Sequence, residues 1–309
     1  MTAQEPAVRN SARYPEPVPA DPATATTAFH FDPETMAALG DERAPEYSAA
    51  DPFPHIVFGD FLPAERLRAV LSEFPGPGDI PWTLFEDGGR TLKLATENQE
   101  YMGELTRQLL MECNGPVFVD FLERLTGITG LVPDPYLLGG GLHQIEPGGF
   151  LDVHADFNVH PRTRLHRRIN VLIYLNEDWQ DDWGGQLELW KSDMSRCVQR
   201  IAPVFNRCVI FSTDRTAFHG HPERVACPPG RNRRSLALYY YSLTPAPGEN
   251  DGTWHSTLYQ TPGQQPGAGA THAGNGTPAR GYRERLSRWV PPVAVDAVRR
   301  ARARRAGQA

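Results

Sequence analysis

Phe150-Leu151-Asp152-Val153-His154-Ala155-Asp156 is a short run that directly follows the turn Pro147-Gly148-Gly149. Similar short apolar or alternating runs recur from Tyr136 to Leu243, and turn residues separate them. The expected strands cover residues 136–145, 150–156, 169–175, 186–190, 197–202, 207–212 and 233–243. Several short strands with regular turn signals indicate a sandwich or a barrel, not alternating strands and helices. We therefore expect a mainly β fold.

Two segments before these strands have the periodicity of helices with one buried face. After an expected strand at residues 52–58, a helix begins near Pro63, whose missing N–H costs nothing in a first turn. Its apolar residues at helical spacing are Leu67, Val70, Leu71 and Phe74. The second segment covers residues 104–113 and, after Gly115-Pro116, residues 118–125. We expect support helices within residues 62–126 and a β core at 136–245, which together form one domain, 51–245.

The remaining segments lack this periodicity. Residues 1–50 are rich in Pro, Ala, Thr and Glu, and predict a loosely ordered N-terminal arm. Residues 246–281 are rich in Gly and Pro, which is typical of a long loop. Residues 282–309 form a basic tail in which we expect a solvated helix.

Composition excludes several classes of protein. The formal net charge of −6 over 309 residues argues against a nucleic-acid-binding protein, which needs a basic surface to displace counterions. No apolar run approaches the roughly 20 residues of a membrane span, and no secretory signal is visible. The four cysteines are widely spaced, which favours free thiols over disulfides or zinc ligands. The expected location is the cytoplasm.

His154 and Asp156 are candidate metal ligands. A strand places residues i and i+2 on the same face, so both side chains project together. Two histidines and one carboxylate form the facial triad that suits non-haem Fe(II) and leaves coordination positions open. His-x-Asp alone is a weak signal, because a histidine near a strand end is usually only hydrogen-bonded. His219 strengthens it, since it follows the apolar run 208–211, which would deliver it to the mouth of a barrel.

Arg233 is a candidate carboxylate-binding residue at the start of the last expected strand. A guanidinium can hold a carboxylate through two parallel hydrogen bonds, and Ser235 on the same face can add a hydroxyl. Arg234 is the rival. Strand alternation favours Arg233, because it places Arg233 and Ser235 on the inner face while Leu236 and Leu238 face the support helices.

Residues 143–242 resemble the catalytic domain of the 2-oxoglutarate- and Fe(II)-dependent oxygenases. Within that family, the pattern is most similar to the prolyl-hydroxylase-like branch. The order and spacing of several stretches carry the resemblance over about 100 residues. These stretches are His154-Ala155-Asp156, residues 168–179, residues 184–190, residues 211–214, His219 and residues 233–241. The resemblance implies a double-stranded β-helix, a cupin-like jelly-roll barrel with flanking helices and the metal at its open end.

The resemblance also implies roles for individual residues. His154, Asp156 and His219 would bind Fe(II), and the family spacing favours His219 over His221. Arg233 would bind the distal carboxylate of 2-oxoglutarate, and Tyr174 would hydrogen-bond the same end. Leu187 and Ser235 would line the pocket. O2 would be the second co-substrate, with ascorbate as a candidate reductant.

The expected activity is hydroxylation of a small, amino-acid-derived metabolite, with release of succinate and CO2. Related halogenases replace the metal-binding carboxylate with a small residue, so Asp156 argues for hydroxylation. One alternative is a prolyl-type hydroxylase that acts on a protein, and another is a non-catalytic jelly-roll that binds a ligand. A basic cluster after the metal tripeptide is either a solvated loop or a site for an anionic substrate. Its members are His160, Arg162, Arg164, His166, Arg167 and Arg168.

Overall fold

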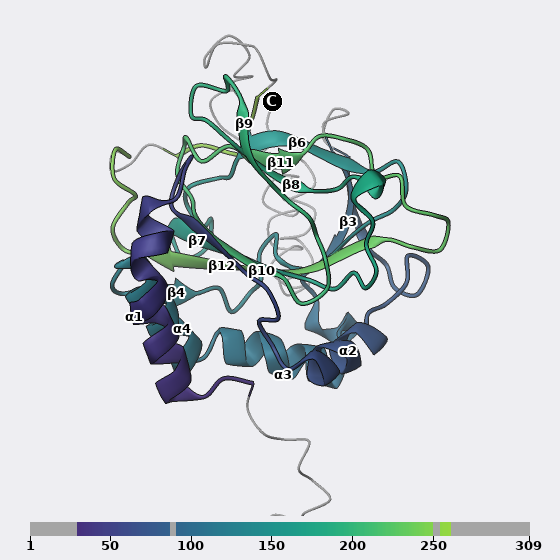
Figure 1. Cartoon of the computed structure of the whole chain (residues 1–309), viewed down its shortest axis with the longest axis horizontal. Helices are drawn as coiled ribbons and strands as arrows, with labels where there is room; N and C mark the ends of the chain where they lie inside the picture. The colour runs from purple at the N-terminus through teal and green to yellow at the C-terminus, as the bar shows by residue number, and fades with distance from the viewer. Residues whose placement is uncertain (1–29, 87–90, 250–253, 261–309) are drawn as a thin grey trace, which may run out of the picture. The chain divides into compact units, whose positions relative to one another are not determined.

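The computed structural model of the chain describes residues 30–86, 91–249 and 254–260 (Figure 1). Within them, thirteen strands belong to one curled antiparallel sheet. The strands are β1 (His55–Phe58), β2 (Thr83–Phe85), β3 (Thr91–Thr96), β4 (Val132–Pro133), β5 (Gly141–Ile145), β6 (Phe150–Ala155), β7 (His166–Tyr174), β8 (Leu187–Trp190), β9 (Cys197–Ile201), β10 (Cys208–Ser212), β11 (His219–His221), β12 (Arg233–Ser242) and β13 (Leu258–Tyr259). The expected mainly β jelly-roll is therefore confirmed.

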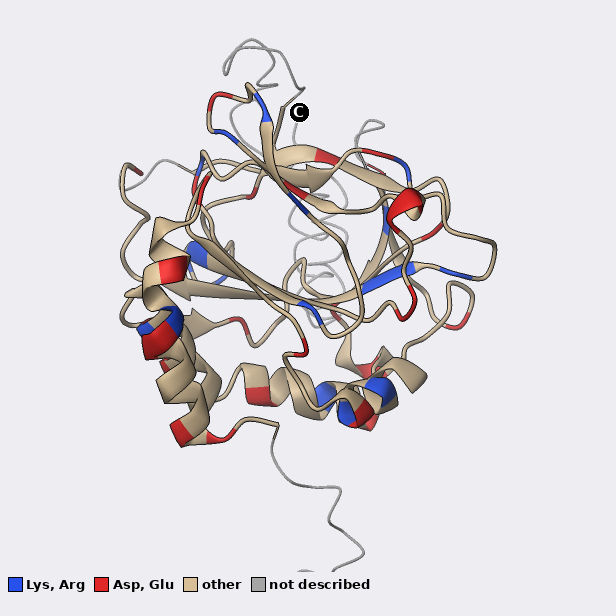
Figure 2. Ribbon diagram, in the orientation of Figure 1, with Lys and Arg blue, Asp and Glu red and all other residues tan. Residues whose placement is uncertain are grey.

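The sheet curls because β3 joins its two halves. The larger half has the strand order β1-β10-β7-β12-β5-β3, and the smaller half has the order β3-β6-β11-β8-β9. Residues 94–96 of β3 pair with β5, whereas residues 91 and 92 pair with β6. The short strands β2, β4 and β13 add to β3, β12 and β6, respectively. Charged residues lie mostly on helices and loops, and the strands are predominantly uncharged (Figure 2).

Four α-helices cover the outer face of the larger half of the sheet (Figure 1). They are α1 (Pro33–Ala49), α2 (Ala64–Ser72), α3 (Glu104–Cys113) and α4 (Pro116–Thr126), and the short 3-10 helices are η2 (Gln99–Tyr101) and η3 (Asp181–Trp183). Gly127 ends α4 in the left-handed conformation (φ 70°), which glycine adopts without a steric penalty. Leu236, Leu238 and Tyr240 of β12 pack with the helices, while Ala237, Tyr239 and Tyr241 form a separate cluster on the opposite face. The predicted alternation along this strand is confirmed.

The prediction of a loosely ordered arm over residues 1–50 is wrong for residues 33–49, because these residues form α1. The Asp32 side chain caps the helix by accepting a hydrogen bond from the backbone N–H of Thr35 (2.9 Å). Tyr47, which is 1% exposed, packs in the core, and its hydroxyl hydrogen-bonds the Ser212 hydroxyl at 2.7 Å. Residues 1–29 lie outside the described residues.

Two further expectations differ from the structure. The strand expected at 136–145 begins only at Gly141, because the Asp134 carboxylate accepts hydrogen bonds from the backbone N–H groups of Tyr136 and Leu138 and holds a turn there. The expected loop 246–281 contains β13, which pairs with β6. The rest of that loop beyond Gln260, and the basic tail, lie outside the described residues. No helix in the described part of the chain is long and apolar enough to cross a membrane.

Candidate active site

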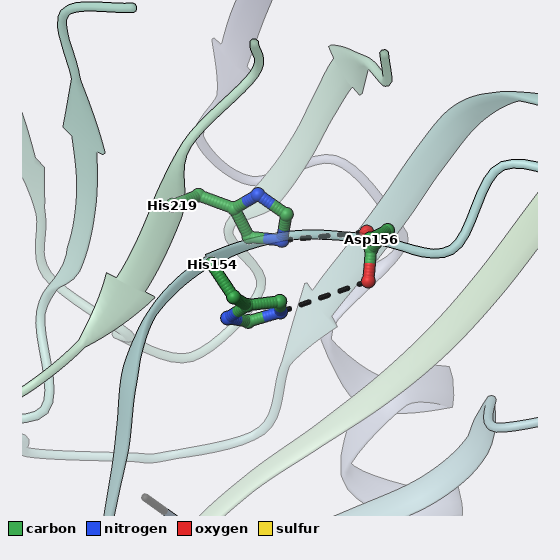
Figure 3. A group of neighbouring side chains, drawn as sticks. All are labelled: His154, Asp156 and His219. Atoms are coloured by element: carbon green, nitrogen blue, oxygen red, sulfur yellow. Dashed lines mark ion pairs between the residues drawn. The ribbon is translucent and has the colours of Figure 1, made fainter. Parts of the chain in front are cut away.

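Three side chains form a candidate metal-binding group on the inner face of the smaller half of the sheet (Figure 3). His154 lies in β6, Asp156 directly follows this strand, and His219 begins β11, where it pairs with His154. One ligand atom from each residue lies within 4.8 Å of the others. His154 Nε2 lies 3.6 Å from Asp156 Oδ1, and His219 Nε2 lies 3.5 Å from Asp156 Oδ2. The structure therefore brings together the three residues that the sequence singled out.

The two imidazoles are oriented by backbone carbonyl groups. Nδ1 of His154 lies 2.9 Å from the carbonyl oxygen of Asp152, and Nδ1 of His219 lies 2.9 Å from that of Ala217. A carbonyl oxygen only accepts, so each Nδ1 carries a proton, and Nε2 is the ring nitrogen left to face a metal. Burial lowers the pKa of His219 to about 4, although Asp156 opposes that shift. Both Nε2 atoms point toward Asp156, as metal ligands require.

Asp156 is held by two side chains of β7. The Asn170 amide donates a hydrogen bond to Asp156 Oδ2 (2.8 Å), and Arg167 Nη2 lies 3.0 Å from the same oxygen. Burial raises the pKa of Asp156, but Arg167 and then the two histidines outweigh it and hold this pKa well below its ordinary value. The carboxylate is therefore ionised. Two imidazoles and one fixed carboxylate are a donor set that fits Fe(II).

Arg233 is buried and contacts Tyr174, the other residue expected to bind the 2-oxoglutarate carboxylate. Arg233 Nε donates to the carbonyl oxygen of Gly185 (2.6 Å), and Nη2 donates to the Tyr174 hydroxyl (3.2 Å). Burial raises the pKa of Tyr174, which keeps its hydroxyl protonated. Ser235 is 2% exposed and pairs directly with Tyr174, while Leu187 is 3% exposed and packs in the same cluster as Tyr174.

The two rival residues take other positions. The Arg234 guanidinium lies 5.3 Å from the ring centroid of Phe74, among the helix-facing residues, so it does not share the inner face with Arg233. His221 is buried (3% exposed), like His219, but it does not belong to the group that could bind a metal. Burial, and then the charges of Arg233 and Lys93, hold the pKa of His221 well below its ordinary value. Neither ring nitrogen has a hydrogen-bond partner among the described residues.

The basic cluster does not form one surface. Only Arg167 reaches Asp156, and its guanidinium lies 3.5 Å from the ring centroid of Tyr239. Arg168 instead donates to the Ser242 hydroxyl (3.0 Å), and Arg162 stacks on the ring of Tyr136. These arginines therefore lie in different surroundings, and a role of the cluster in binding an anionic substrate stays a prediction.

Two nearby elements carry residues that the sequence interpretation missed. Lys93 of β3 is half-buried on the inner face of the sheet, and the alternation Leu92-Lys93-Leu94 was the signal that could have located it. Tyr259 of β13 pairs with His154, and the two ring centroids are 5.6 Å apart. A two-residue strand in a Gly/Pro-rich segment gives no usable sequence signal.

Comparisons with known proteins found a matching family model and similar solved structures. Residues 140–241 match the family model described as the 2OG-Fe(II) oxygenase superfamily. Similar solved structures include a Pseudomonas putida prolyl-4-hydroxylase (22% identity, 67% of this chain and 98% of that chain, TM-score 0.45). Another is a Trichoplax adhaerens prolyl hydroxylase in complex with a hypoxia inducible factor peptide fragment (20%, 68% and 91%, TM-score 0.42). A third is HygX from Streptomyces hygroscopicus with nickel, 2-oxoglutarate and hygromycin B bound (11%, 65% and 86%, TM-score 0.45).

A search of curated protein sequences finds no match. The segment matched by the family model contains His154, Asp156, His219 and Arg233. Residues 140–241 therefore form a 2OG-Fe(II) oxygenase segment, the kind of enzyme segment that uses Fe(II) as cofactor and 2-oxoglutarate as co-substrate, and His154, Asp156 and His219 are the residues in it that could bind the iron.

Proposed function

We propose that this oxygenase hydroxylates a C–H bond of a small, amino-acid-derived metabolite. In this proposal His154, Asp156 and His219 bind Fe(II). Arg233 and Tyr174 bind the distal carboxylate of 2-oxoglutarate, and Ser235 and Leu187 line its pocket. The observation that carries the proposal is the presence of a 2-His-1-carboxylate group and a buried arginine–tyrosine pair in the interior of the same sheet. A purely structural metal site has no need for such a pair.

When bound, Fe(II) with 2-oxoglutarate and O2 supplies the oxidising chemistry: one oxygen atom enters the C–H bond, and the other enters the succinate formed as CO2 leaves. The protein's task is to bind and orient the reactants. Arg233 is fixed by Gly185 and Tyr174 before any ligand arrives, so little order is lost when it binds a carboxylate. Asn170 and Arg167 fix the orientation of Asp156.

Two features support hydroxylation of a compact substrate. Asp156 occupies the carboxylate position of the triad, which leaves no vacant ligand site there for chloride. In addition, β13 pairs with β6 beside His154, so the chain itself covers the edge of the strand that carries this histidine. A covered edge favours a small molecule over an extended peptide lying along β6.

The test combines binding with turnover. Under anaerobic conditions, Fe(II) and 2-oxoglutarate together should give the weak visible absorption of the metal-bound keto acid, and a chelator should abolish it. In air, a screen of amino acids, related metabolites and proline-containing peptides should show succinate release stimulated by a small molecule. Stimulation by peptides alone would transfer the proposal to the protein-hydroxylase alternative. Absence of both the absorption and succinate release would leave only a non-catalytic jelly-roll.

A further inference from the structure

Lys93 is one of only two lysines in a chain with 31 basic residues, the other being Lys191. The position of Lys93 follows from strand register. Ala95, two residues further along β3, pairs with His143, and His143 in turn pairs with Ser235 on the inner face of the sheet. Residues i and i+2 share a face, so Lys93 also points inward. Its ammonium lies 5.0 Å from the ring centroid of Phe85, its pairing partner in β2.

Lys93 has no anionic partner among the described residues. No carboxylate of these residues lies within 4.0 Å of its ammonium. The charged groups that act on it are Asp156, which attracts it, and then Arg167 and Arg233, which repel it. Asp156 is already in contact with Arg167 at 3.0 Å and is the proposed ligand of a divalent metal. Lys93 is half-buried on the inner face of the sheet, and a cation that is partly removed from water without its own counterion favours a ligand that supplies the anion.

The formal charges of the loaded site lead to the same conclusion. The three cations Lys93, Arg167 and Arg233 and a divalent metal add to +5, whereas Asp156 and the 2-oxoglutarate dianion add to −3. The difference is +2, so the site remains positive after the metal and the co-substrate bind.

His221 provides an independent observation. It is 3% exposed, its pKa is affected by both Lys93 and Arg233, and neither ring nitrogen has a partner among the described residues.

Lys93 could bind either the distal carboxylate of 2-oxoglutarate or a carboxylate of the substrate, and its location distinguishes between the two. The co-substrate's distal carboxylate already has Arg233 and Tyr174 as proposed partners on β12 and β7. Lys93 lies on another strand, its strongest charge interaction is with Asp156 at the metal group, and the Phe85 ring beside it is 37% exposed to solvent. It therefore faces the metal group from the side of the β2–β3 ribbon, where a substrate can approach. We propose that Lys93 binds a carboxylate group of the substrate, so that the enzyme acts on an organic acid or an amino acid with a free carboxylate. This inference rests on the proposed function.

The kinetic test compares carboxylates with their amides. Succinate release is measured with the twenty amino acids, a set of organic acids and the corresponding amides. The acids should stimulate turnover and their amides should not. Lys93→Met should raise the KM for the best acid about 10- to 100-fold, the range expected for one charge-assisted hydrogen bond, and should change the affinity for the co-substrate less than about twofold. Lys191→Met is the matched control, because Lys191 is paired with Asp51 on the surface at 2.6 Å.

A binding test is independent of turnover. Protein labelled with ¹³C at the lysine ε-carbons has only two lysine signals, which the Lys191→Arg variant assigns. With Zn(II) and 2-oxoglutarate bound, acetate should shift the Lys93 signal, whereas acetamide should not. An acetate-dependent shift without any succinate release would defeat the proposed activity and leave the anion site standing. An unshifted signal, equal use of acids and amides, or a Lys93→Met effect confined to 2-oxoglutarate would each overturn the inference.

Discussion

Replacement of Arg233 by methionine should weaken 2-oxoglutarate binding more than 100-fold. Arg233 is 5% exposed, and two of its nitrogens are already oriented by Gly185 and Tyr174. A charge-assisted hydrogen bond contributes about 1.5–3 kcal/mol, so two parallel bonds to a carboxylate contribute at least about 3 kcal/mol. That free energy corresponds to a roughly 150-fold increase in Kd. Methionine preserves most of the buried volume, so the loss reports on the charge and its hydrogen bonds.

Arg234→Met is the matched control for this prediction. Arg234 is adjacent in sequence, but its guanidinium stacks on Phe74 on the helix-facing side of β12. Calorimetric titration of 2-oxoglutarate into the Zn(II)-loaded protein should give a nearly unchanged Kd for Arg234→Met. Tyr174→Phe, which removes one hydroxyl near the same carboxylate, should raise the Kd by about 5- to 15-fold.

The order of these three variants tests the reasoning. If Arg234→Met weakens binding as much as Arg233→Met, the inner face of β12 has been assigned wrongly. If both arginine variants bind 2-oxoglutarate normally, another cation holds the carboxylate, and Lys93 becomes the first candidate because it is an interior cation without an ion-pair partner among the described residues.

Four further predictions concern the metal group, the fold and pH. Asn170→Ala removes a 2.8 Å hydrogen bond to the metal-binding carboxylate and should lower Fe(II) affinity about 10- to 100-fold in a chelator competition assay. In the same assay, His219→Ala should abolish tight binding, whereas His221→Asn should change it less than about threefold. Tyr47→Ala should lower the free energy of unfolding by about 3–5 kcal/mol in a urea titration, because the side chain is 1% exposed; an unchanged value would mean that α1 is not part of the folded core. Burial lowers the pKa of Lys93 to about 8, so its positive charge is present below that pH and is lost as the pH rises through it. The KM for a carboxylate substrate should therefore increase above about pH 8, and a flat profile there would contradict the role of Lys93.

The strands that the sequence predicted best are those buried on both faces. Residues of β10 and β12 are almost entirely buried, and burial of both faces requires the continuous apolar runs that made these strands visible. The ribbon of β2 and β3 was missed because its outward side chains, Leu84 and Leu92, are exposed and its inward residue is a lysine. Its pattern is therefore the reverse of the one expected for a half-buried strand.

Helix α1 was missed because its stability comes from tertiary contacts. Only Met36, Gly40 and Tyr47 of its seventeen residues are buried, and Pro45 lies inside the helix. A helix with so few buried residues and an internal proline has little intrinsic stability, and packing against α4 supplies what the sequence does not show. Gly40 makes this packing possible, since a Cβ atom there would lie 3.0 Å from the carbonyl oxygen of Phe121.

The metal group was predictable because two of its residues, His154 and Asp156, lie two positions apart at the end of one strand. The residues that orient or surround this group come from other strands. Asn170 and Arg167 reach Asp156 from β7, and Lys93 reaches the interior from β3. These contacts depend on strand register and on the curl of the sheet. Neither can be derived from local spacing along one chain.

Gly220 shows how the curl of the sheet converts a local motif into a site. Its φ is not positive, so conformational freedom is not the reason for a glycine at this position. A Cβ atom on residue 220 would instead lie 2.9 Å from the carbonyl oxygens of Leu151 and Asp152, closer than β6 could tolerate without moving. The missing side chain lets β11 lie directly against β6, with a register shift between its two histidines. That close contact holds His219 at the metal group while His221, two residues later, lies near Arg233 and Lys93. His219-Gly220-His221 is therefore best understood as one unit, in which the glycine allows two histidines to serve different parts of the same interior.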